Sequence, residues 1–321
     1  MNTIVFAAKL DGLDRLNLYM LVAGTMTLLL AGGFYAYYLL KQGVLASRTT
    51  AQLATSGGGN TSVSLKAEAT MQPRHPAGTY ANVLHVVAII FLALAVTFRW
   101  IVTGHAPYSN QYEFASALTF STALIGFILV RQFRQQSLGA FVAPLSALIG
   151  LYAIIIPVLM PEQRDVKNLI PALQNGLMLT IHVAMAIAAY GGFVVAGGAA
   201  IMYLLQRDKE PKRKWLPSRI VLDDIGYQSV LIGFPLMIAV LVLGGLWAKD
   251  AWGAFWSWDP KETAALVTAL VYGVYLHAHS LPRWKGSRSA WLLVLGLVAT
   301  VFTFLGNYFL GGLHTYGVPG K

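Results

Sequence analysis

The sequence has no cysteine among its 321 residues. This absence excludes disulfide bonds, thiolate metal sites and redox chemistry at the protein's own sulfur. Any thiol reaction that the protein supports must therefore use the thiols of a partner. Charged residues are also scarce, at 11%, whereas hydrophobic residues make up 56% and the mean hydropathy is +0.60. These proportions exclude an ordinary soluble domain.

Long apolar runs take the place of that missing charge. Inside the hydrocarbon core of a bilayer, backbone polar groups can pair only within their own segment, so runs of about 20 apolar residues must be helices. The sequence predicts an all-α, polytopic integral membrane protein with about eight transmembrane helices. The first run lacks a small-residue cleavage site and is read as a span, not a cleaved signal. The runs lie approximately at 18–40, 82–103, 113–131, 139–159, 173–205, 227–247, 263–281 and 289–310.

Three segments are predicted along the chain. Residues 1–45 contain the first transmembrane helix. Residues 46–80 include a Gly- and Ser-rich stretch and little apolar periodicity, which predicts a flexible cytoplasmic linker. Residues 81–321 form the membrane core. No internal repeat is evident in the sequence, so a repeat-built transporter finds no support.

The formal charge of +10 is unevenly placed. Fifteen of the 23 Lys and Arg residues fall in the connections 41–81, 131–138, 206–225 and 281–288, and the alternate connections and ends hold seven. Because basic residues concentrate in cytoplasmic loops, both termini and the interval 247–262 are predicted to be extracytoplasmic. Topology alone explains the excess charge, so no nucleic-acid partner is expected. Contact of the basic loops with anionic membrane lipid stays open.

Four of the eight tryptophans fall within twelve positions in the interval 247–262, which we call the tryptophan interval. Trp252 and Trp256 are four residues apart and share one face if the stretch is helical, with Phe255 beside them. An aromatic belt at the membrane interface is the alternative explanation. Four tryptophans on one connection exceed what a belt requires, so the interval is predicted to hold a large, flat, apolar surface. They are Trp247, Trp252, Trp256 and Trp258.

The end of the tryptophan interval has the pattern of a helix start. Asp259 is a suitable N-cap, Pro260 suits the first helical position, and Glu262 falls three residues after the cap. These residues are therefore assigned to fixing the exit of the interval and not to acid–base catalysis.

Four histidines lie in or next to the apolar runs. A histidine in a membrane segment is costly and is a functional candidate, although a hydrogen bond across helices stays open for each. His182 falls in the outer half of its helix and His314 just beyond the outer end of the last one, on the side of the tryptophan interval. His277 lies roughly 20 Å from the outer end of its helix, at a rise of about 1.5 Å per residue. His85 has a comparable depth.

Two imidazoles beside an aromatic platform favour one kind of ligand. Zinc usually takes three or four protein ligands, so His182 and His314 alone would make a poor zinc site. A planar iron macrocycle needs one or two axial imidazoles and an apolar surface for its faces. The sequence therefore predicts a bound iron porphyrin.

The same residues resemble a known family. The stretch Trp252-Gly253-x-x-Trp256-x-Trp258-Asp259-Pro260-Lys261-Glu262 resembles the WWD signature of haem-handling proteins. Together with the segments around His277 and His314, it is similar to the CcsA (ResC) subunits of System II cytochrome c synthases. The resemblance covers roughly residues 82–317. It departs at Thr263-Ala264-Ala265, where that family usually has another tryptophan, and at His279, where arginine is common.

The resemblance implies a haem site with named ligands. His182 and His314 would be the axial ligands of an outer haem b, bound as substrate. His277 would be the intramembrane histidine that receives haem from the cytoplasmic side, with His85 as an in-chain alternative for its second ligand. The outer haem would be held by residues of the tryptophan interval: Trp252, Trp256, Trp258 and Asp259, with Gly253 and Trp247 as further candidates.

The resemblance also implies a function in cytochrome c biogenesis. The protein would carry haem across the membrane and present it for thioether attachment to the Cys-x-x-Cys-His segment of an apocytochrome c, as part of a haem lyase complex. Its membrane partner would be a CcsB, ResB or Ccs1 subunit. A haem chaperone or exporter without lyase activity is the first alternative, and a solute transporter or purely structural subunit the second. A bacterial plasma membrane is expected rather than a thylakoid.

Overall fold

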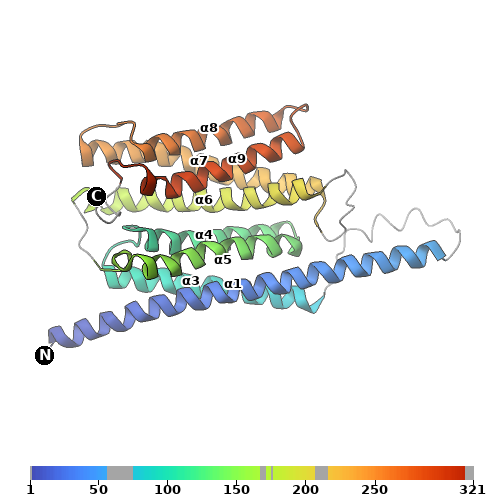
Figure 1. Cartoon of the computed structure of the whole chain (residues 1–321), viewed down its shortest axis with the longest axis horizontal. Coiled ribbons are helices and arrows are strands. Elements are labelled where there is room, and N and C mark those ends of the chain that lie inside the picture. Colours follow the sequence, from blue (N-terminus) through green and yellow to red (C-terminus); the bar gives the residue numbers. More distant parts are fainter. Residues whose placement is uncertain (1, 56–74, 167–170, 175, 207–215, 315–321) are drawn as a thin grey trace.

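The computed structural model describes residues 2–55, 75–166, 171–174, 176–206 and 216–314, and all regular structure within these ranges is helical (Figure 1). Two short 3-10 helices, η1 (Pro161–Gln163) and η2 (Pro171–Gln174), lie in the connection before α6. The long helices are α1 (Asn2–Thr55), α3 (Pro76–Thr103), α4 (Gln111–Gln132), α5 (Gln136–Leu159), α6 (Gly176–Leu205), α7 (Arg219–Trp252), α8 (Pro260–Ser280) and α9 (Ser287–Phe309).

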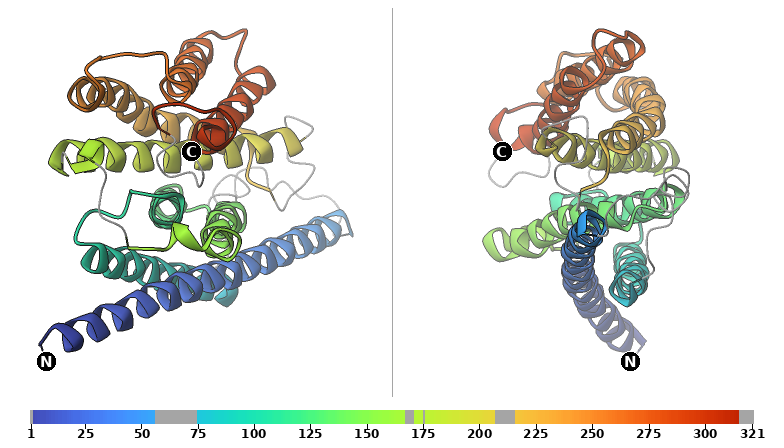
Figure 2. Two further views of the ribbon diagram at one scale, coloured as in Figure 1. Left: turned by 60° about the vertical axis from the view of Figure 1, so that its left-hand side comes forward. Right: turned by 90° about the vertical axis from the view of Figure 1, so that its right-hand side faces the viewer.

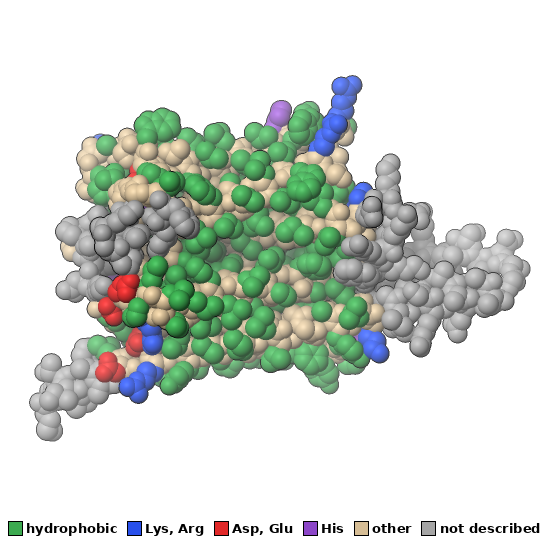
Figure 3. Space-filling view, in the orientation of Figure 1, with side chains coloured by type: hydrophobic (Ala, Val, Ile, Leu, Met, Phe, Trp, Pro, Cys, Tyr) green, Lys and Arg blue, Asp and Glu red, His purple; other side chains and the backbone are tan. Residues whose placement is uncertain are grey.

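The predicted class, an all-α multi-pass membrane protein, is confirmed. Within the described residues, seven helices are long and apolar enough to cross a membrane, and hydrophobic side chains cover the flank of the bundle (Figure 3). The expected number was eight. The difference is α8, which runs alongside α7 and α9 but is less apolar than the seven. It begins with Lys261 and Glu262 and ends with His277 and His279.

The expected linker at residues 46–80 is shorter at both ends than predicted. Helix α1 continues to Thr55 and α3 begins at Pro76, where His75 caps its first turn. Residues 56–74 lie outside the described residues. The apolar run predicted at 18–40 is thus the middle of a longer helix.

Helix α6 joins two groups of helices, one of α1, α3, α4 and α5 and the other of α7, α8 and α9 (Figures 1 and 2). Four glycines let it approach its neighbours closely. Each of them faces a different helix: in chain order these are α4, α7, α9 and α5. A Cβ atom added to any of the four would come within 2.7 to 3.1 Å of an atom on that helix. The glycines are Gly191, Gly192, Gly197 and Gly198.

A buried ion-pair network ties the first group together at one end of the bundle. Arg99 of α3 lies 2.9 Å from both Asp14 of α1 and Glu113 of α4, and Arg164 pairs with Asp14 at 2.6 Å. The opposite charges are balanced, which a buried arginine requires. Glu113 also accepts hydrogen bonds from the backbone and hydroxyl of Ser109. The network therefore fixes the loop before α4, which forms one wall of the cavity described next.

Candidate functional site

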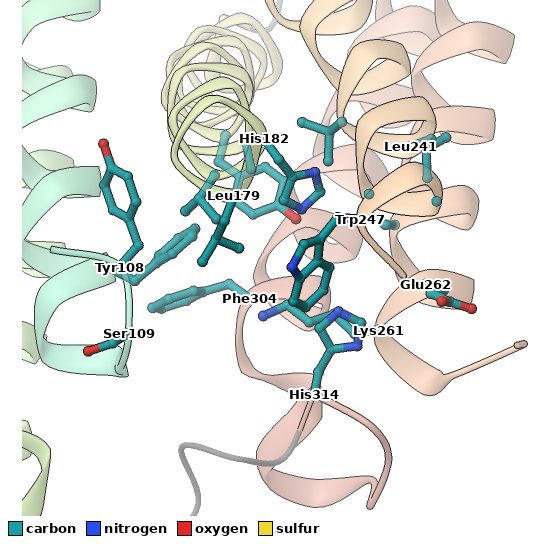
Figure 4. A pocket seen from close by; sticks show the side chains of 18 of the residues that line it. Tyr108, Ser109, Leu179, His182, Leu241, Trp247, Lys261, Glu262, Phe304 and His314 are labelled. Atoms are coloured by element: carbon teal, nitrogen blue, oxygen red, sulfur yellow. The ribbon is translucent and has the colours of Figure 1, made fainter. Parts of the chain in front are cut away.

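A cavity opens at this end of the bundle, between the loop before α4, the helices α6 and α7, the start of α8 and the end of α9 (Figure 4). It contains about 1120 Å³ of empty space, part of which is open to solvent. Aromatic, aliphatic and a few polar side chains line it, a composition typical of sites for large organic ligands. The lining residues include Tyr108, Ser109, Gln111, Phe114, Leu179, His182, Tyr190, Gly244, Trp247, Trp256, Lys261, Phe304 and His314.

His182 and His314, about 130 residues apart in sequence, both line this cavity. The indole of Trp247 lies between them in Figure 4 and contacts both. Its ring centroid is 6.3 Å from that of His182, in a stacked arrangement, and 5.8 Å from that of His314. The two histidines that were predicted to share a ligand are thus brought to one cavity from α6 and from the segment after α9.

His314 is oriented by the carboxylate of Asp259. Oδ2 accepts a hydrogen bond from His314 Nδ1 at 2.7 Å, and Oδ1 accepts one from the backbone N–H of Leu313 at 2.5 Å. Because an ionised carboxylate only accepts, Nδ1 carries the proton and Nε2 carries the lone pair of the neutral ring. Carboxylate–histidine pairs of this kind fix the ring that ligates a metal.

The two groups of this pair have shifted pKa values. Burial lowers the pKa of His314, and the hydrogen bond to Asp259 offsets part of that shift. For Asp259, burial alone would raise the pKa of the carboxyl group. The hydrogen bonds from His314 and from two backbone N–H groups bring that pKa below its usual value. The pair is therefore a carboxylate with a neutral imidazole near neutral pH, which is the form of histidine that binds metals.

His182 is positioned by a close approach of α7. A Cβ atom at Gly244 would lie 2.7 Å from Cε1 of the His182 ring, so only glycine leaves room for the ring there. Its buried Nδ1 has no hydrogen-bond partner among the described residues. A buried nitrogen without a partner carries a free-energy penalty.

Trp252 and Trp256 would share one face if the stretch were helical, and residues 253–256 are not helical. Helix α7 ends at Trp252 because Gly253 adopts a left-handed φ of +80° and caps it. Trp252 instead packs edge-on against Trp247 and His314, at centroid distances of 4.6 and 4.8 Å. Trp256 lines the cavity, and the 69% exposed Trp258 packs edge-on against it. Trp247 and Trp252 thus contact His314, and Trp247 and Trp256 line the cavity itself.

The predicted start of α8 is confirmed. Asp259 is its N-cap and forms a capping box with Glu262, and Pro260 occupies the first position. What the sequence did not reveal is that the same carboxylate also holds His314 and Leu313. One side chain therefore joins the helix start to the segment after α9.

The other two histidines lie away from the cavity. His277 is exposed near the end of α8, with its side chain on the outer surface of the bundle. His85 is fully buried among α1, α3 and α4. Its Nε2 lies 3.1 Å from the carbonyl oxygen of Ala123, and its ring packs against that of Phe127. His85 therefore belongs to the other group of helices, where its Nε2 is engaged and its buried Nδ1 has no partner among the described residues.

Sequence reasoning assigned no role to several residues that line the cavity. They come from the loop before α4, from α4 and α9, and from the first turn of α8. Two local signals point to them: Lys261 lies in the WWD-like stretch, and Asn110 is an N-cap three residues before Glu113. The residues are Tyr108, Ser109, Gln111, Phe114, Phe304 and Lys261.

Comparisons with known proteins identify the family. A family model described as "Cytochrome C assembly protein" matches residues 108–314, which include every residue that lines the cavity. The chain is 32% identical over 254 residues to the cytochrome c biogenesis protein CcsA of Guillardia theta, covering 72% of this chain and 83% of that protein. It is 32% identical over 267 residues to CcsA of Prochlorococcus marinus, covering 74% and 83%.

A solved structure shares the fold. The cytochrome c heme lyase CcmF aligns with a TM-score of 0.58 at 16% identity, over 89% of this chain and 47% of that longer one. At this identity the likeness concerns the fold alone. The match of the family model and the similarity to the two CcsA proteins are more specific. The chain therefore belongs to the cytochrome c assembly protein family, as a relative of the cytochrome c biogenesis proteins named CcsA.

Proposed function

We propose that the protein binds haem b as a substrate in this cavity and presents it for covalent attachment to apocytochrome c. One observation carries the proposal: His182 and His314 line the same cavity, on either side of Trp247. In this proposal the two imidazoles are the axial ligands of the iron. The aromatic walls bury the faces of the porphyrin.

The donor set fits an iron porphyrin better than an isolated metal ion. Among the described residues, no group of three His, Cys, Asp or Glu side chains could hold a metal ion. A porphyrin supplies four ligands itself, so two imidazoles complete the coordination of its iron. His314 offers Nε2 with its lone pair, and the ring of His182 lines the same cavity.

The chemistry then requires little of this chain beyond positioning. Each thiol of a Cys-x-x-Cys-His segment adds across one haem vinyl group, with sulfur bonding to one carbon and hydrogen to the other. The addition involves no net oxidation or reduction. Because the chain has no cysteine, both thiols come from the apocytochrome. Holding the reactants together supplies a large part of the rate acceleration in such a site.

His277 supports a route by which haem reaches the cavity. Its side chain is exposed on α8, where a neighbouring membrane subunit can supply a second imidazole. We assign that role to a subunit of the CcsB, ResB or Ccs1 type. The cavity end of the bundle is then extracytoplasmic, in agreement with the distribution of Lys and Arg. We further propose a bacterial plasma membrane, and not a thylakoid, as the host membrane.

Co-expression with the partner subunit and an apocytochrome c tests the proposed activity. We expect a haem-containing cytochrome that keeps its haem on a denaturing gel, because thioether bonds survive denaturation. An apocytochrome with both cysteines replaced by alanine is the matched control and should retain none. Haem in the purified protein without any thioether product would identify a chaperone or exporter. Absence of haem from the protein would refute haem binding itself.

The close contact at Gly244 gives a separate prediction. Gly244→Ala places a Cβ atom 2.7 Å from the His182 ring and must displace it. Because changes that disturb the orientation of a metal-ligating histidine typically cost about tenfold to a hundredfold in affinity, we expect haem affinity to fall by about tenfold or more. Titration with haem, followed by absorption, measures the effect.

Gly273→Ala is the control for this substitution. Its Cβ atom would be 3.5 Å from the Phe234 ring, an ordinary contact. Alanine in place of glycine also favours a helix by up to about 1 kcal/mol at both positions, so neither variant should unfold. Equal haem affinity in the two variants would show that Gly244 does not position His182.

A further inference from the structure

Lys261 is a cation at the wall of the cavity that the proposed function leaves without a role. It lies in the first turn of α8, next to Asp259, and is partly buried. In Figure 4 its side chain lies beside Trp247 and His314, whereas Glu262, which also lines the cavity, lies farther from these two rings. Lys261 therefore brings a positive charge to a space whose other walls are mostly aromatic and aliphatic.

The neighbouring carboxylates are already engaged. Glu262 accepts hydrogen bonds from the backbone and hydroxyl of Ser257 and from the backbone of Asp259. Asp259 holds His314, Leu313 and the backbone N–H of Lys261. Within the described ranges, no carboxylate oxygen lies within 4.0 Å of the Lys261 ammonium group, and Asp259 attracts it from a longer distance.

A partly desolvated cation without a close counter-ion is costly, and the cost is recovered when an anion binds. We propose that Lys261 binds a carboxylate of the ligand in the cavity, which for haem is one of its two propionates. This inference rests on the proposed function and adds to it. In haem the propionates and the vinyl groups lie on opposite halves of the ring. An ion pair at Lys261 therefore places the propionate edge of the porphyrin at α8. The vinyl edge then faces away from α8, towards the wall that Tyr108 and Ser109 form (Figure 4).

The test compares two porphyrins that differ only in this charge. Full-length protein in detergent is titrated with ferric protoporphyrin IX and with its dimethyl ester, whose propionates are neutral. Since a hydrogen bond between charged groups is worth about tenfold or more in affinity, the wild type should prefer the diacid by about that factor. Lys261→Met should lose the preference and keep the low-spin spectrum of histidine ligation. Lys261→Arg should retain the preference.

Lys249→Met is the matched control, since Lys249 is exposed at the end of α7 and does not line the cavity. It should behave as the wild type. An undiminished preference for the diacid in Lys261→Met would overturn the inference and leave the proposed function intact. If neither Lys261→Met nor Lys261→Arg binds either porphyrin, Lys261 serves in packing, and this result would also overturn the inference. If the wild type binds neither porphyrin, the proposed function fails and the inference fails with it.

Discussion

His182→Ala and His314→Ala are each expected to abolish holocytochrome c formation in cells that also express the partner subunit and an apocytochrome. Both rings line the cavity and contact Trp247, so each variant removes one of the two imidazoles that the site offers. Iron with an open axial position is exposed to oxygen chemistry, and its haem is no longer fixed for thiol addition. The yield of thioether-linked haem on a denaturing gel measures the effect.

The control for these variants is His105→Ala. His105 lies in the loop before α4, at the same end of the bundle, and its ring contacts the carbonyl oxygen of Ala106 and not the main cavity. It should support normal yields. A second arm separates ligation from folding: imidazole added to His314→Gly should restore part of the haem binding, because a free ring can occupy the vacated space. Normal yields in both alanine variants would refute the ligand assignment.

Asp259→Asn is expected to weaken haem binding by about tenfold to a hundredfold, the usual effect of losing the partner of a metal-ligating histidine. The carboxylate holds His314 Nδ1 and Leu313 N–H with its two oxygens. An amide has one oxygen and a donor NH₂ group, so it cannot accept both bonds. Asparagine is as good an N-cap as aspartate, so the start of α8 should survive.

Two measurements check this second prediction. Haem titration gives the affinity, and a redox titration gives the reduction potential of the bound haem. Loss of the negative charge behind His314 makes the ring a weaker donor to iron, so the potential should rise. Asp250→Asn, at an exposed position in the last turn of α7, is the control and should leave both quantities unchanged. Unaltered affinity and potential in Asp259→Asn would show that Asp259 serves only as a helix cap.

The membrane fold was predictable because long apolar runs follow directly from the physics of the bilayer. The extent of individual helices was not. Helix α1 passes well beyond its apolar run at both ends, since nothing in the polar flanks prevents a helix from continuing. Helix α8 was expected to be a full span, although its terminal turns carry Lys261, Glu262, His277 and His279, which make it less apolar than its neighbours.

The site was predictable where one residue type carries the signal. Histidines near the ends of two helices and a cluster of tryptophans indicate, by their positions in the chain alone, the end of the bundle at which the cavity lies. The conformation of the cluster was not predictable from spacing alone, because Gly253 ends α7 and turns Trp256 and Trp258 away from the axis that Trp252 follows. A glycine after an apolar run is a signal for the end of a helix. Gly253 therefore ends the helix before Trp256, and the four-residue spacing does not place the two rings on one face.

Contacts between distant segments lay beyond sequence reasoning. The bond between Asp259 and His314 joins residues 55 positions apart, and Gly244 meets His182 across a helix interface. The loop of Tyr108 and Ser109 reaches the cavity only because the ion pairs of Arg99 fix the residues around Glu113. Such contacts depend on how the helices pack, which one sequence does not specify.

The most direct test is a structure of the full-length protein with haem bound, determined by electron microscopy with its partner subunit. Our account predicts one porphyrin in the cavity, with its iron between the rings of His182 and His314 and the Asp259–His314 hydrogen bond retained. A haem in this cavity with any other pair of axial ligands, or a haem bound only elsewhere in the protein, would contradict it.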